Sequence, residues 1–208
     1  MVDIQKSVIV MSRMEEMEQL SRISRLGPIA RRYFAMNAFD GTLTILGIVL
    51  AYHFAAHTDS NAIVSAGIGA CLAMMFSGLA GTFLAEKAER ERELSEMERA
   101  MLRNLDDTVV KKANRFAIII SSLVDGFAPF LCGLILLIPF IGIVVGIPIP
   151  WITAVSVSGV TGFIMLFLLG IFLGRVSEQN PWFYGLQTLG AGVGTAIAII
   201  ILEFITSV

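Results

Sequence analysis

The chain has 208 residues, of which 56% are hydrophobic and 15% are charged, and its formal net charge is −2. So apolar a composition indicates a membrane protein, and so small a net charge gives no reason to expect a nucleic-acid partner. Fourteen of the fifteen Lys and Arg residues lie in two clusters, Lys6 to Arg32 and Lys87 to Arg115, and the fifteenth is Arg175. The sequence therefore predicts one all-α integral membrane domain.

Residues 1–35 are expected to form a cytoplasmic N-terminal segment. A weakly amphipathic helix is predicted from Ile4 to Arg25, and Gly27-Pro28 should end it. Such a helix could lie on the inner leaflet of the membrane. The segment mixes acidic and Arg residues and has no apolar run followed by a small-residue cleavage site, so no cleavable signal peptide is expected.

Apolar stretches of roughly 20 residues are long enough to cross a bilayer. Five are predicted, two in residues 36–85 and three in residues 113–206: about Met36 to His57, Ala62 to Ala85, Ala113 to Leu137, Trp151 to Gly174, and Gly185 to Ile205. The connections after the first and third spans and the C-terminus contain no Lys or Arg. The positive-inside rule therefore places the N-terminus in the cytoplasm and the C-terminus outside or in a lumen.

The second span has no helix-breaking residue at its inner end. It is therefore predicted to continue into the cytoplasm as a long acidic helical extension within residues 86–112. Four glutamates fall within about 80° of one another on this helix: Glu86, Glu89, Glu93 and Glu96. They either collect divalent cations where these enter the protein, or form a solvated face with ordinary pairs such as Glu86 with Arg90.

An apolar stripe runs beside these glutamates and consists of Leu94, Met97, Met101 and Leu105. Outside the bilayer such a stripe needs a cover. We therefore expect it to pack against the N-terminal helix, the cytoplasmic end of the third span, or a second subunit.

Two short motifs recur at similar offsets. Phe39-Asp40-Gly41 is echoed by Val124-Asp125-Gly126, and GTFL at residues 81–84 is echoed by GIFL at residues 170–173. Because two spans separate the copies, they share one orientation. This predicts a parallel two-helix repeat with a fifth helix added.

Asp40 and Asp125 are the acidic residues well inside the spans, roughly 12 to 15 Å beyond the nearest basic residues. A carboxylate at that depth is costly unless it faces a partner, water or a cation. Because the repeat makes their positions equivalent, the two could share one divalent cation or a proton. The alternative is that each caps a helix or bonds a neighbouring serine such as Ser121 or Ser122.

Several further residues of the spans could affect metal binding. Pro129 removes the amide that would bond the Asp125 carbonyl, which either frees an oxygen ligand or simply kinks the helix. Possible soft ligands are Met36, Met74 and Met75.

His53 and His57, at i and i+4, should share one face and could form an outer exit site. Cys71 and Cys132 are expected to be packed thiols, with metal ligation as the alternative and no disulfide.

Two segments, NAFDGTLT at residues 37–44 and GLAGTFLAEKAE at residues 78–89, resemble the vacuolar iron transporter family, which includes the yeast vacuolar calcium/iron carrier. The resemblance covers about Arg31 to Ile205. It implies five spans, an inside N-terminus, a dimer around a central pathway, and export of Fe²⁺ or Mn²⁺ from the cytosol in exchange for protons. By this resemblance Asp40 matches the family's membrane-embedded aspartate, and Glu89 matches the first glutamate of its metal-collecting domain.

The second-span motif departs from that family, because a pore methionine and a pore carboxylate are missing after Ser77 and Gly81. Met74 or Met75 could replace the first and Asp125 the second. The leading hypothesis is a homodimeric, proton-coupled exporter with Fe²⁺ or Mn²⁺ as substrate and no permanently bound cofactor.

The alternative is a non-transporting membrane scaffold whose acidic helix docks a partner. A lipid transferase is the weakest reading, since it would need a denser cluster of aspartates. The sequence contains no Ser/His/Asp set, P-loop or zinc spacing, so no enzyme is expected.

Overall fold

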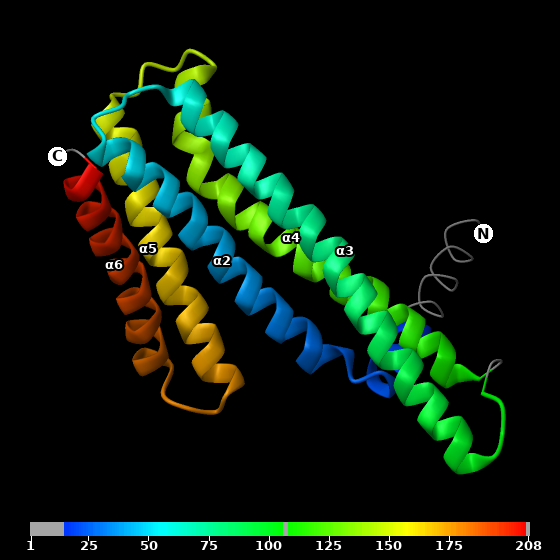
Figure 1. The fold of residues 1–208 in the computed structure, drawn as a ribbon. Coiled ribbons are helices and arrows are strands. Elements are labelled where there is room, and N and C mark those ends of the chain that lie inside the picture. The colour runs from blue at the N-terminus through cyan, green and yellow to red at the C-terminus, as the bar shows by residue number, and fades with distance from the viewer. Residues whose placement is uncertain (1–14, 106–107, 207–208) are drawn as a thin grey trace, which may run out of the picture. The chain divides into compact units, whose positions relative to one another are not determined.

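The computed structural model describes residues 15–105 and 108–206, and all regular secondary structure within them is helical (Figure 1). Residues 15–23 form a helix, and five long helices follow: α2 (Leu26–Phe54), α3 (Ser60–Met101), α4 (Val109–Val144), α5 (Trp151–Val176) and α6 (Pro181–Thr206). Each of the five is long and apolar enough to cross a membrane. The chain is therefore an all-α, multi-pass membrane protein, as the sequence predicts.

Helix α3 is much longer than a membrane span. Its 42 residues measure about 63 Å at 1.5 Å per residue, whereas the hydrocarbon core of a bilayer is about 30 Å thick. All of its charged side chains lie between Glu86 and Arg99, and the part before Glu86 has none. One continuous helix therefore joins an apolar span to a charged extension.

The residues divide into two compact units. The first contains residues 15–33 and Ser77–Asp125, and the second contains Phe34–Phe76 and residues 126–206. Helices α3 and α4 are each divided between the two units, α3 after Phe76 and α4 after Asp125.

The core of the second unit is built from side chains of α2, α3, α4 and α5. Its fully buried members include Ile45, Leu46, Leu136, Leu137 and Phe140. In a water-soluble protein, burying one such side chain stabilises the fold by about 1.5–3 kcal/mol. Between membrane-spanning helices the surrounding lipid is equally apolar, so close packing supplies the stabilising energy instead.

Close approach between α5 and α6 depends on Gly170. A Cβ on Gly170 would lie 2.5 Å from the carbonyl oxygen of Tyr184 and 2.6 Å from Cα of Gly185. The Thr188 hydroxyl donates to the carbonyl of Leu166 at 2.8 Å and so links the same two helices. A small residue thus brings the backbones together, and a polar side chain bonds across the gap.

Two predicted helix boundaries are wrong. The N-terminal break occurs at Arg25, which has φ 51°, and not at Gly27-Pro28. Pro28 instead lies in the first turn of α2, where its missing N–H is not needed. Helix α2 ends at Phe54, where Ala56 with φ 56° turns the chain, so His57 lies beyond the helix.

Candidate functional site

One face of α2 carries an exposed stripe around the middle of the helix. Met36, Asp40 and Thr44 follow at intervals of four residues and are all exposed, Met36 by 58%. Residues four apart lie on one side of a helix, and we call this set the Asp40 stripe. The buried side of α2 carries Ala35, Ala38, Thr42, Ile45, Leu46 and Val49. Asp40 is the midpoint of Leu26–Phe54, and Met36 lies one turn nearer the basic end of the helix, so the stripe presents a carboxylate and a thioether within the apolar part of α2.

Gly41 determines how closely α2 approaches α4. A Cβ on Gly41 would lie 2.5 Å from both Cα and the carbonyl oxygen of Pro129, so this crossing requires glycine. Pro129 is fully buried, and α4 continues through it as a helix. Since Gly41 and Thr42 are buried while Asp40 is exposed, the crossing fixes the side of α2 on which the carboxylate lies.

Asp125 is the buried carboxylate of α4, only 5% exposed. The Thr82 hydroxyl on α3 donates a hydrogen bond to its Oδ2 at 2.5 Å. Nearby, the Ser121 hydroxyl is buried and has no hydrogen-bond partner within the described part of the chain, while Ser122 donates to the carbonyl of Ile119 at 2.9 Å. Thr82 is a partner for this carboxylate that the sequence analysis missed, because nothing local relates residue 82 to residue 125.

The predicted membrane ligands are divided between the two units. Asp40, Met36, Met74 and Met75 belong to the second unit and Asp125 to the first. Met74 packs against the core of the second unit, and Met75 is half-buried beside it in α3. A site shared by Asp40 and Asp125 accordingly stays a prediction.

Glu86 belongs to a buried network in the first unit. Its carboxylate accepts hydrogen bonds from the Tyr33 hydroxyl and from Nε of Arg90, both at 3.0 Å. Arg90 is 6% exposed and also donates to Oδ1 of Asn114 at 3.1 Å and to the carbonyl of Ser24 at 3.5 Å. The network therefore ties the N-terminal segment to α3 and α4, and it gives Glu86 structural partners.

The other predicted collecting residues lie on the surface of the extension. Glu89 and Glu93 are exposed, and Glu96 accepts a hydrogen bond from Nε of exposed Arg92 at 3.1 Å. Exposed pairs of this kind contribute little to stability.

The apolar stripe beside these glutamates is covered only in part. Leu94 and Leu105 are buried, whereas Met97 and Met101 are 37% and 61% exposed. Within the single chain the two leucines are therefore covered, and packing of the two methionines against a second subunit stays a prediction.

The histidines do not share a helical face, which corrects the prediction made from their spacing. His53 is in the last turn of α2 beside the ring of Phe54, with centroids 5.5 Å apart. His57 is exposed in the following turn, and its ring centroid is 6.1 Å from that of Tyr52. The i, i+4 rule fails because the helix ends between the two residues.

The metal-binding potential of a single chain is limited. Residues 15–105 and 108–206 contain no group of three or more His, Cys, Asp or Glu side chains placed to hold a metal ion. Cys71 and Cys132 are free and buried, in agreement with packed thiols. The candidate oxygen and sulfur donors within the spans are thus Asp40 with Met36 on the exposed stripe, and Asp125 with Thr82 in the first unit.

Comparison with known proteins identifies one archaeal relative and no family. No protein-family model matches the chain. The uncharacterized protein MJ0645 of Methanocaldococcus jannaschii is 29% identical over 181 residues, which cover 85% of this chain and 90% of that protein. The similarity spans most of both chains, and the relative is uncharacterized, so it assigns no activity to this chain.

Proposed function

We propose that the chain is an exporter of divalent metal cations, Fe²⁺ or Mn²⁺, that works as a homodimer and exchanges the metal for protons. The main support is the exposed position of Asp40 at the midpoint of a spanning helix. A carboxylate at the centre of a bilayer costs about 3 kcal/mol or more unless something polar covers it. A second copy with an ion or proton between the two chains would remove that cost.

A symmetric pair suits the Asp40 stripe, because both copies then use the same surface. A twofold axis beside the stripe would bring two Asp40 carboxylates and two Met36 thioethers to one site. Two carboxylates there cannot both stay ionised without a counter-charge. A divalent cation supplies it, and protons supply it when the metal leaves, so one pair of carboxylates couples metal release to proton uptake.

Sulfur ligands bear on which metal is carried. A thioether is a softer ligand than oxygen and suits Fe²⁺ or Mn²⁺ better than Ca²⁺ or Mg²⁺. Met36 lies one turn before Asp40 and is exposed on the same stripe. Met74 and Met75 remain proposed ligands from α3, the helix that also supplies Thr82.

Asp125 is proposed as a second carrier of the metal or proton. It is buried and bonded by Thr82, and its sequence surroundings repeat those of Asp40, as a parallel repeat of two helices would require. Both Asp-Gly pairs lie within continuous helix. Closely packed helices, and not unwound segments, therefore position these carboxylates in the proposed mechanism.

We place the charged half of α3 in the cytoplasm, together with the N-terminus. The distribution of Lys and Arg supports this orientation, and the length of α3 supports an extension beyond the bilayer. Exposed Glu89 and Glu93 are then the residues best placed to attract metal ions. Glu86 is better assigned to the network with Arg90. In this orientation His53, in the last turn of α2, and His57, just beyond that helix, are on the outer side.

Flux in proteoliposomes tests the proposal. Asp40→Asn should abolish Fe²⁺ or Mn²⁺ flux across a pH gradient, and Asp125→Asn should reduce it about tenfold, because each change removes a charge but keeps volume and hydrogen bonding. Asp59→Asn is the matched control, since exposed Asp59 caps α3 by accepting from the Asn61 amide at 2.9 Å and Asn caps equally well.

Two measurements decide the outcome. Asp40→Asn protein should elute and melt like the wild type, which shows that lost flux is not lost folding. Normal flux through Asp40→Asn at saturating and limiting metal would refute the transport mechanism.

A scaffold is the second candidate, and the exposed Met97 and Met101 on the extension favour it. An apolar pair on a charged helix is suited to a partner protein. A scaffold predicts no metal flux in wild-type proteoliposomes, and that result would select it over the exporter.

A further inference from the structure

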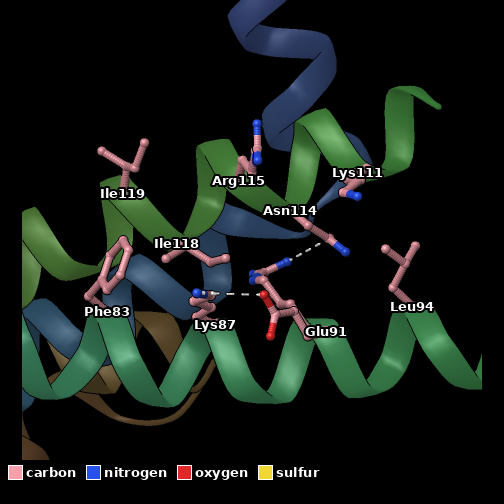
Figure 2. Close-up of a pocket in the computed structure, with 10 residues that line it drawn as sticks. Phe83, Lys87, Glu91, Leu94, Lys111, Asn114, Arg115, Ile118 and Ile119 are labelled. Atoms are coloured by element: carbon pink, nitrogen blue, oxygen red, sulfur yellow. Dashed lines mark hydrogen bonds and ion pairs between the residues drawn. The ribbon is translucent and has the colours of Figure 1, made fainter. Parts of the chain in front are cut away.

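The first unit contains a pocket that the proposed transport route does not use. It has a volume of about 500 Å³ and lies between the charged part of α3 and the N-terminal part of α4 (Figure 2). Its apolar lining includes Phe83, Ile118 and Ile119, and its basic lining includes Lys87 and Arg115. The pocket thus combines two kinds of surface in one concavity.

These two kinds of surface meet where the membrane spans end. Phe83, Ile118 and Ile119 belong to the uncharged stretches of α3 and α4, whereas Lys87 and Arg115 are among the first charged residues beyond them. Phe83 is 42% and Ile119 is 52% exposed. The pocket therefore lies at the level where hydrocarbon gives way to lipid headgroups, whichever side of the membrane that is.

The positive charge of the pocket is incompletely balanced by the protein. Arg90 also lines it, but that guanidinium is paired with Glu86 at 3.0 Å. Lys87 and Glu91 are 3.8 Å apart with side chains 51% and 67% exposed, so they form a weak pair. Arg115 is exposed and forms no ion pair or hydrogen bond with the residues that the structure describes.

We propose that this pocket binds an anionic glycerophospholipid, with the headgroup phosphate against Lys87 and Arg115 and the acyl chains along Phe83, Ile118 and Ile119. Basic pockets between membrane helices at the bilayer surface take such headgroups. The long aliphatic stems of Lys and Arg can follow the apolar wall while their charges reach the phosphate. The assignment does not depend on whether the protein transports a metal.

The chemistry of the pocket favours a lipid over other occupants. A free phosphate would leave the apolar wall unfilled, and an apolar helix from a second copy would bury Lys87 and Arg115 without a counter-charge. A phospholipid satisfies both surfaces and is already present at this depth.

Native mass spectrometry of the full-length protein tests the proposal. Protein purified in detergent is mixed with phosphatidylglycerol or phosphatidylcholine, and the retained lipid is counted. One basic residue near an anionic lipid surface contributes about 1 kcal/mol, which is about fivefold in affinity. Lys87→Gln and Arg115→Gln should therefore each weaken retention of phosphatidylglycerol about fivefold. The double variant should weaken it roughly 25-fold. Phosphatidylcholine has the same phosphate but balances it with its own choline cation, so the wild type should retain it less and these variants should change its retention less.

Three further variants distinguish specific binding from general attraction. Lys112→Gln removes a neighbouring exposed charge outside the pocket and should have no effect, and Arg115→Lys should retain the lipid. Phe83→Ala should weaken retention of phosphatidylglycerol without affecting the phosphate contacts.

Several outcomes would overturn the proposal. Wild-type retention by the double variant is one, and an equal loss in Lys112→Gln is another. Phosphatidylglycerol binding that inorganic phosphate fully displaces, or that is insensitive to Phe83→Ala, would show a phosphate site and not a lipid site.

Discussion

Replacing Gly41 by alanine should destabilise the protein, because α2 and α4 touch through their backbones at this residue. The new Cβ would lie 2.5 Å from Cα and the carbonyl oxygen of Pro129 and 2.8 Å from its carbonyl carbon. Carbon atoms in favourable contact are about 3.5–4.0 Å apart. The helices must therefore separate by about 1 Å, and no flexible side chain is available to move instead.

The size of the effect follows from two opposing contributions. Overpacking of this kind costs about 1–3 kcal/mol, and alanine recovers up to about 1 kcal/mol through its higher helix propensity. The net loss is thus about 0–3 kcal/mol, and a value in the middle of this range, about 1–2 kcal/mol, should lower the melting temperature by roughly 2–8 °C for a chain of this size. Because Asp40 adjoins Gly41, the shift should also reduce metal flux.

Gly47→Ala is the matched control on the same helix. A Cβ there would meet only Cδ1 of Ile199, at 3.7 Å, which is ordinary contact. Melting in detergent should therefore show Gly47→Ala equal to or more stable than the wild type and Gly41→Ala less stable. Equal melting temperatures for Gly41→Ala and Gly47→Ala would refute the close crossing of α2 and α4.

Three further predictions concern the first unit and the topology. Arg90→Met should lower the free energy of unfolding by about 3 kcal/mol or more, because it leaves the largely buried Glu86 carboxylate without its cation. Adding Glu86→Gln should recover part of this loss. A double variant no more stable than Arg90→Met alone would contradict the prediction. Thr82→Val should destabilise by about 1–3 kcal/mol by removing the donor to Asp125, whereas Thr82→Ser should melt near the wild type. A reporter fused after Val208 should face outside and one inserted near Asp106 should face the cytoplasm; labelling of both from one side would disprove the five-span topology.

The five spans and the long α3 could be predicted from sequence because both depend on local properties. A run of uncharged apolar residues can be measured directly against the thickness of a bilayer, and no breaker separates the second span from the charged helix after it. The end of α2 was less predictable. The turn at Ala56 uses a left-handed residue that is not glycine, so the composition gave no stop signal before His57.

The candidate site was only partly predictable. The sequence marks Asp40 and Asp125 as costly at mid-membrane depth, since desolvation depends mainly on where a residue lies along a span. It does not indicate that Asp40 is exposed on the single chain, or that Asp125 receives a hydrogen bond from Thr82.

By itself, then, the sequence determined which segments span the membrane and which carboxylates need a partner, because both follow from the identity of residues close together in the chain. Only the tertiary structure decided which side of α2 is covered, through the contact of Gly41 with Pro129, and that the Glu86–Arg90 pair is buried, through the bonds of Arg90 to Asn114 and to the carbonyl of Ser24. Those outcomes depend on helices that approach within van der Waals distance, and sequence separation carries no information about such contacts.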